Sequence, residues 1–166
     1  MNASTIRELC ASGRHDDALH LAKALALSNP TDAEIQFEAA CVHDFLGAER
    51  EAVPYYRAAL AGPLDADRRL QALVGLGSTY RTLGRYAEAQ EVLLRAVSEF
   101  PAAHEAKVFL AMVRHNLGLH KAAVELLLEV IVETSGDAGV NRYRRAIEFY
   151  AQDVDKTWPG GEPDVA

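Results

Sequence analysis

Residues 70–103, LQALVGLGSTYRTLGRYAEAQEVLLRAVSEFPAA, contain two amphipathic segments of helix length joined by one tight turn. Apolar and small residues recur every three or four positions on both sides of Gly84, which is the spacing of one helix face. Glycine adopts the left-handed conformation of a helix end without steric cost, and Pro101 cannot continue the backbone hydrogen bonds of the second helix. The two helices must therefore pack antiparallel.

The same unit recurs when the chain is aligned on the turn glycine. The intervals between successive turn glycines are 34, 37 and 34 residues, and a period in this range indicates a solenoid. The longer interval comes from the connector 61–69. Five residues after each glycine stands an alanine, whose small side chain lets the second helix approach the first. The glycines are Gly13, Gly47, Gly84 and Gly118, and the alanines are Ala18, Ala52, Ala89 and Ala123.

The best unit resembles the tetratricopeptide repeat, whose consensus runs Trp, Leu-Gly, Tyr, Ala, Phe, Pro over 34 residues. Its matching residues are Leu73 at the Trp position, Leu76-Gly77, Tyr80, Ala89, Leu93 at the Phe position and Pro101. The chain also resembles small stand-alone bacterial tetratricopeptide proteins, especially over residues 69–158. The resemblance implies an all-α fold: a right-handed α-solenoid of antiparallel helix pairs, with about four units and a C-terminal capping helix.

The repeats divide the chain into one tetratricopeptide domain, 1–157, and a tail, 158–166, that is expected to be disordered. The expected units are 1–32, which is truncated at its first helix, 33–66, 70–103 and 104–137. A capping helix is expected over 140–156, because an open apolar face at the end of a solenoid needs cover. Its apolar side is expected to carry Tyr143, Ile147, Tyr150 and Val154, with Trp158 continuing the same helical spacing.

Composition excludes several classes of protein. A formal net charge of −7 argues against a nucleic-acid or anionic-membrane binder, because that affinity requires a concentrated basic surface. Cys10 and Cys41 do not make a disulfide framework, and the first residues contain no apolar core of signal-peptide length behind basic residues. No window approaches the ~20 apolar residues of a membrane span. A cytoplasmic protein is expected.

A search for catalytic or ligand motifs finds none. Gly75 and Gly77 lack the third glycine and preceding strand of a dinucleotide site. The six histidines include no pair at the i, i+4 spacing that places two metal ligands on one helix face. Cys41 and His115 belong to non-adjacent units, which argues against a catalytic dyad. We therefore predict no enzyme activity, no cofactor and no metal.

The resemblance also implies a binding surface, because the leading helix of each pair lines the concave side of a tetratricopeptide solenoid. An apolar centre, an adaptable methionine and a few polar groups suit an amphipathic helix or an extended peptide, and Arg81 and Arg142 are candidates to orient an acidic group. The predicted groove residues are Phe37, Cys41, Asp44, Phe45, Val74, Ser78, Arg81, Val108, Met112, His115, Asn116 and Arg142.

The leading functional hypothesis is a non-enzymatic protein–protein interaction module that binds a protein or peptide partner in this groove. An alternative is a homo-oligomeric scaffold that assembles through the edge of the first unit or through the closing helix. A third, less supported, is an enzyme or small-molecule-binding protein that uses the groove, for which loss of turnover in Cys41→Ser would be diagnostic.

Overall fold

The computed structural model describes residues 2–157, which form ten helices and no strand, as predicted for an all-α chain. In chain order they are α1 (Ala3–Ala11), α2 (His15–Ser28), α3 (Ala33–Phe45), α4 (Glu49–Ala61), α5 (Ala66–Thr82), α6 (Tyr86–Glu99), α7 (His104–Asn116), α8 (His120–Thr134), α9 (Ala138–Arg142) and α10 (Arg144–Ala151).

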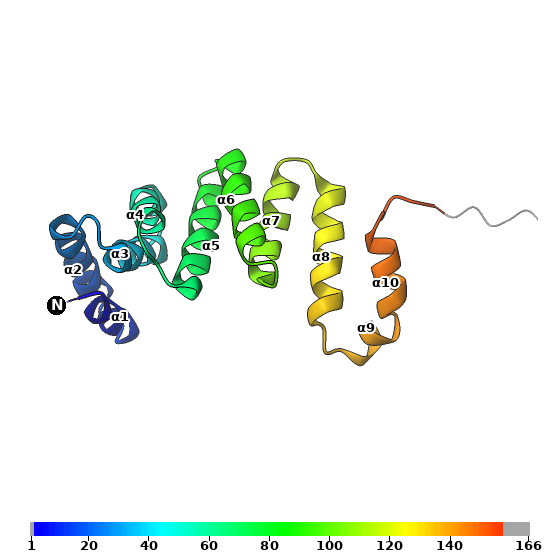
Figure 1. Ribbon diagram of the computed structural model, residues 1–166, viewed down its shortest axis with the longest axis horizontal. Helices are drawn as coiled ribbons and strands as arrows, with labels where there is room; N and C mark the ends of the chain where they lie inside the picture. The colour runs from blue at the N-terminus through cyan, green and yellow to red at the C-terminus, as the bar shows by residue number, and fades with distance from the viewer. Residues whose placement is uncertain (1, 158–166) are drawn as a thin grey trace, which may run out of the picture.

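The first eight helices form four antiparallel pairs that stack into a solenoid (Figure 1). Each pair is closed by a turn in which the glycine has positive φ, for example +72° at Gly84. The Gly84 N–H donates to the Arg81 carbonyl at 3.0 Å and the Arg85 N–H to the Tyr80 carbonyl at 2.8 Å. These bonds satisfy carbonyl groups that a helix C-terminus otherwise leaves unpaired.

Within each pair, small residues let the helices pack closely. The four alanines that follow the turn glycines are all buried. At Gly77 of α5 the approach is closer still, because a Cβ there would lie 2.5 Å from Leu93 Cγ of α6. Between pairs, the leading helices α1, α3, α5 and α7 also contact one another in succession. These four helices form a continuous layer. The side chains on the solvent side of that layer make up what we call the leading-helix surface.

The first unit is short but folded. Asn2 caps α1: its side chain accepts the Thr5 N–H, and Thr5 in turn accepts the Asn2 N–H. Ile6 is completely buried against α2 and α3. A nine-residue helix is too short to be stable alone, so packing of Ile6 and its neighbours holds α1 in place.

The C-terminal segment differs from the single helix expected over 140–156. It forms α9 and α10, and the bend lies at Tyr143, where φ is −105° and ψ is 9°. The Tyr143 N–H bonds to the Val140 carbonyl three residues back, which tightens the turn, while the Asn141 side chain donates to the Ser135 carbonyl at 3.3 Å. The bend turns Tyr143 and Tyr150 to solvent, so their predicted inward orientation is wrong.

Ile147 and Val154 are half-buried. The tail predicted to be disordered, 158–166, lies outside the described residues. Within 2–157, no helix has the length and the apolar character needed to cross a membrane.

Leu93 provides a test of this packing. It is completely buried, so Leu93→Ala should lower the free energy of unfolding by about 2–5 kcal/mol. Urea denaturation followed by circular dichroism measures this change. The matched control is Leu94→Ala, because Leu94 is 45% exposed and should shift stability by less than about 0.5 kcal/mol. Equal losses in the two variants would contradict the assigned helix faces.

Candidate functional site

The predicted groove residues lie in different environments in the structure. Phe37 does not line a groove: it is 2% exposed and belongs to the core. Its ring packs beside Tyr56 and beneath the Arg68 guanidinium, which lies 5.3 Å from the ring centroid. Phe37 faces the following repeat unit rather than solvent, so the prediction that it contacts a ligand is wrong.

The predicted groove residues of α5 and α7 lie nearer the surface. Val74 is half-buried and packs on the apolar cluster between α5, α6 and α7. Ser78 and Val108 are also half-buried, and Met112 is exposed. They come from α5 and α7, whereas Cys41, Asp44 and Phe45 come from α3. The structure therefore places these residues along successive leading helices.

A cleft of about 490 Å³ lies at the N-terminal end of this surface, between α1 and α3. Phe45, which is 70% exposed, stacks with its ring centroid 4.6 Å from that of His15. We name this feature the α1–α3 cleft. The residues that line it are Arg7, Cys10, Ala11, His15, Glu38, Cys41, Val42 and Phe45.

A buried carboxylate forms the polar wall of the α1–α3 cleft. Glu38 Oε1 accepts a hydrogen bond from Arg7 Nη1 at 2.6 Å and lies 3.4 Å from Arg68 Nη1. Burial raises the pKa of Glu38, and the two arginines act in the opposite direction. These contacts link α1, α3 and α5. Sequence analysis missed Glu38, although it stands three residues before Cys41 and seven before Phe45, a spacing that puts all three on one helix face.

Asp44 is a half-buried acid near the end of α3. Its Oδ2 accepts a hydrogen bond from the Tyr56 hydroxyl at 3.2 Å, and its Oδ1 lies 3.0 Å from the Thr79 hydroxyl. Burial raises the pKa of Asp44, while both hydrogen bonds favour its ionised form. Because the three residues come from α3, α4 and α5, Asp44 joins two repeat units rather than presenting a free carboxylate to a ligand.

The remaining predicted residues lie on the later units. The Arg81 Nε donates to Asn116 Oδ1 at 2.8 Å, which ties α5 to α7. His115 and His120 face each other, with their Nδ1 atoms 3.1 Å apart. Arg142 lies on α9, where it lines a hollow with Tyr143 and Tyr150 of the C-terminal segment. The structure therefore brings Arg142 together with aromatic side chains and not with the α1–α3 cleft.

Cys41 has the environment of an unreactive thiol. Burial raises its pKa to about 12, and the Tyr56 hydroxyl lies 4.0 Å from its sulfur. Because the thiolate is the nucleophilic form of cysteine, this pKa disfavours catalysis at neutral pH. Its hypothetical dyad partner, His115, contacts His120 instead.

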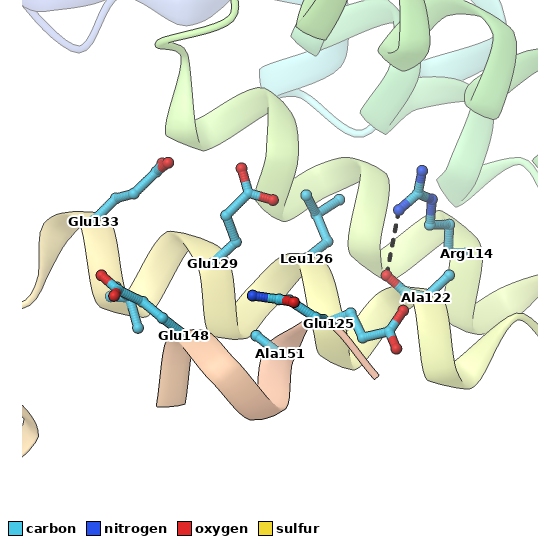
Figure 2. A pocket seen from close by; sticks show the side chains of 10 residues that line it. Arg114, Ala122, Glu125, Leu126, Glu129, Glu133, Glu148 and Ala151 are labelled. Carbon is cyan, nitrogen blue, oxygen red and sulfur yellow. Dashed lines mark hydrogen bonds between the residues drawn. The ribbon is translucent and has the colours of Figure 1, made fainter. Parts of the chain in front are cut away.

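A cleft of about 400 Å³ lies between α8 and α10 and carries several carboxylates (Figure 2). Glu125, Glu129 and Glu133 follow one another at four-residue spacing on α8, and Glu148 projects from α10. Lys107 pairs with two of them, at 2.7 Å and 3.0 Å. Among residues 2–157, no group of three or more His, Cys, Asp or Glu side chains has the arrangement of a metal site.

Stacked helix pairs with a side-chain-lined inner layer and a cleft define the class of α-solenoid interaction modules. The family model described as "Tetratrico peptide repeat" matches residues 33–154. The chain therefore belongs to the tetratricopeptide repeat family, whose domains generally mediate protein–protein interactions and are typically non-enzymatic. The resemblance inferred from the turn glycines is confirmed.

The fold also matches a solved structure. The structure titled "Crystal structure of MamA" has a TM-score of 0.69 to this chain, with 17% sequence identity. The alignment covers 87% of this chain and 86% of that one. Identity at this level shows a common fold alone. Comparison with curated protein sequences gives no match.

The Asp44 network predicts a specific effect of Tyr56→Phe. The substitution keeps the ring and removes one hydrogen bond from a half-buried carboxylate, so it should cost about 1–3 kcal/mol in unfolding free energy. The pKa of Asp44 should rise further, because the lost bond favours the ionised form. NMR titration of the carboxyl group and urea denaturation measure the two effects.

The sign of the pH dependence follows from the raised pKa of Asp44 in the folded state. The folded protein then binds more protons than the unfolded chain, so stability falls as pH rises from the unfolded-state pKa to the folded-state pKa. Tyr56→Phe should widen that interval. Tyr55→Phe is the control, because Tyr55 packs on His43 and not on Asp44. An unchanged Asp44 pKa in Tyr56→Phe would contradict the assigned hydrogen bond.

The raised pKa of Cys41 can be tested by thiol labelling in a Cys10→Ser background. At about pH 8, the thiolate fraction should be about a thousand-fold below that of an ordinary cysteine. Labelling by an aromatic disulfide should accelerate with pH up to about 12 and become fast in urea. Rapid labelling of the folded protein near neutral pH would instead reopen the possibility of a catalytic thiol.

Proposed function

We propose that this tetratricopeptide protein binds a short peptide or an amphipathic helix on its leading-helix surface, and that the α1–α3 cleft receives an apolar anchor of the ligand. The exposure of Phe45 beside a cleft that is largely apolar carries this proposal. A large aromatic side chain at such a position offers contact area that a ligand can remove from water.

The polar wall of the α1–α3 cleft orients the bound ligand. Arg7 is 40% exposed in its side chain although it already pairs with Glu38 and, at 3.6 Å, with Glu34. A guanidinium has five N–H donors, so Arg7 retains donors for a carboxylate of the ligand. Arg68 and Glu38 are less exposed and fix the position of Arg7. A ligand with an apolar residue followed by an acidic one fits this arrangement.

Selection of peptides from a random display library, with affinities then measured by calorimetry, tests the proposal. Phe45→Glu places a charge at the anchor position and should weaken the selected peptides at least about tenfold. Arg7→Gln should weaken peptides with an acidic residue more than peptides without one. Circular dichroism would establish that both variants remain helical.

Leu27→Glu is the matched control for Phe45→Glu. Leu27 is also a strongly exposed apolar residue, but it lies on α2 and does not line the α1–α3 cleft. Peptide affinity should therefore be unchanged in Leu27→Glu. Equal affinity of the selected peptides for the wild type and Phe45→Glu would exclude the cleft as their binding site.

A further inference from the structure

The C-terminal end of the solenoid leaves uncovered a face that earlier units bury. Nine residues after the turn glycine, Tyr56 and Leu93 are buried, whereas the equivalent Leu127 of α8 is 36% exposed. Val124 and Ile131, one turn to either side on the same helix face, are 46% and 43% exposed. An apolar stripe of this kind on a repeat protein is the surface on which the next unit stacks.

The earlier units show what normally covers the stripe. On α4, the Tyr56 hydroxyl packs against α5 so closely that a Cβ on Gly75 would lie 2.6 Å away. On α6, Val97 lies in an apolar cluster with Ala106 of α7. In both cases the leading helix of the following unit provides the contact.

The C-terminal segment, which comprises α10 and the residues just after it, packs on a different side of α8. The Val154 N–H donates to Glu125 at 3.3 Å, Lys121 pairs with Asp153, and Val132 is buried. Glu125 and Val132 lie on a different side of α8 from Leu127, given 3.6 residues per turn. Figure 1 shows α10 beside α8, on the side away from α7.

This position of α10 breaks the pattern of the solenoid. The helices α3, α5 and α7 each contact both helices of the preceding pair, whereas α10 packs on α8 and makes no comparable contact with α7. Within the described part of the chain, no leading helix covers the end of the fourth unit. We call this surface the end face, and it consists of Val108, Met112, Val124, Leu127 and Ile131.

The chain itself specifies the helix that fits such a face. Each leading helix that stacks on a preceding unit buries three residues at positions i, i+4 and i+7, placed twelve, eight and five residues before its turn glycine. All are apolar or small except one threonine. They are Ile35, Ala39 and Val42 on α3, Ala72, Leu76 and Thr79 on α5, and Ala106, Leu110 and Val113 on α7.

We propose that the end face binds an amphipathic helix of a partner protein whose apolar stripe repeats this i, i+4, i+7 pattern. The partner helix would lie across α7 and α8 as α7 lies across α5 and α6. This site is separate from the α1–α3 cleft, which lies at the other end of the solenoid. If the contacts between successive units are extended by one more unit, they indicate where the partner helix would lie and which residues it would present.

Two helices of the chain itself fit the end face less well. Head-to-tail stacking would present α1 of a second copy, whose equivalent positions include Thr5 and Glu8, and a glutamate on an apolar face is costly to bury. The C-terminal segment carries Ile147, Ala151 and Val154 at the required spacing, but all three are already half-buried, and Ala151 and Val154 lie beside Glu125, on a different side of α8 from Leu127. A partner helix is therefore the occupant.

Methyl NMR of the full chain tests the proposal, with a synthetic peptide of residues 103–117 as the probe helix. The chain has four isoleucines and two methionines, so its signals report on separate regions. Ile131 and Met112 lie on the end face, Ile6 and Ile35 near the first unit, and Ile147 on α10. We expect the peptide to shift Ile131 and Met112 and to leave the other isoleucines in place.

Paired variants locate the binding. Ile131→Glu should weaken the peptide at least about tenfold, because a charge would face an apolar stripe. Leu94→Glu, an equally exposed site on α6, should leave affinity unchanged. A control peptide with Leu110→Glu should not bind. Equal binding by the two protein variants, or no shift at millimolar peptide, would overturn the proposal.

Two other results would assign the end face to a different occupant and so refute a partner helix. A concentration-dependent dimer in sedimentation experiments, abolished by Ile131→Glu, would assign it to a second copy of the chain. A peptide-free protein in which Ile131→Glu shifts the Ile147 signal strongly, while Leu94→Glu does not, would assign it to α10. A monomer whose Ile147 signal ignores both variants supports the proposal.

Discussion

The close approach of two helices at each glycine turn is the constraint on which the structure depends. The positive φ of Gly84 and the small residue five positions later bring each trailing helix against its leading helix. This close contact also determines how successive units pack. Leu93 fills the space beside Gly77 within its own unit, and the remaining apolar side of the helix pair is left to contact the next unit. Each pair therefore presents one apolar flank forward and one backward, and stacking buries both.

Polar contacts reinforce this stacking at particular places. Glu38 links α1, α3 and α5 through two arginines, and Asp44 links α3 to α4 through the Tyr56 hydroxyl and to α5 through the Thr79 hydroxyl. Removing one partner from such a set leaves a buried charge without compensation, which costs more than the set contributes when intact. These contacts define the orientation between units, and Glu38 also shapes the cleft to which we assign ligand binding.

Periodicity predicted the fold well because the turn glycines and their alanines recur in phase. It predicted the binding surface less well. Phe37, Val74 and Val108 hold equivalent positions, yet Phe37 is in the core and Val108 is not. Helical spacing shows which face a residue occupies, whereas burial depends on the size of the residue opposite it in the next unit. Glu38 was missed for a related reason, since its arginine partners lie 31 and 30 residues away in the sequence.

The C-terminal helix shows where a sequence pattern stops being sufficient. Ile147, Ala151 and Val154 repeat the spacing of Ile35, Ala39 and Val42, which dock α3 onto the first pair, so the C-terminal segment carries the side chains of a leading helix. Its connection to the preceding pair differs, because α9 and the bend at Tyr143 stand between α8 and α10. They direct the chain to the side of α8 that carries Glu125 and not to the side that carries Leu127. The same apolar pattern can thus pack on either of two sides of the preceding pair, and the connecting segment determines which side it contacts. The face that it leaves open has the chemistry of a repeat junction, which is why its natural complement is another helix.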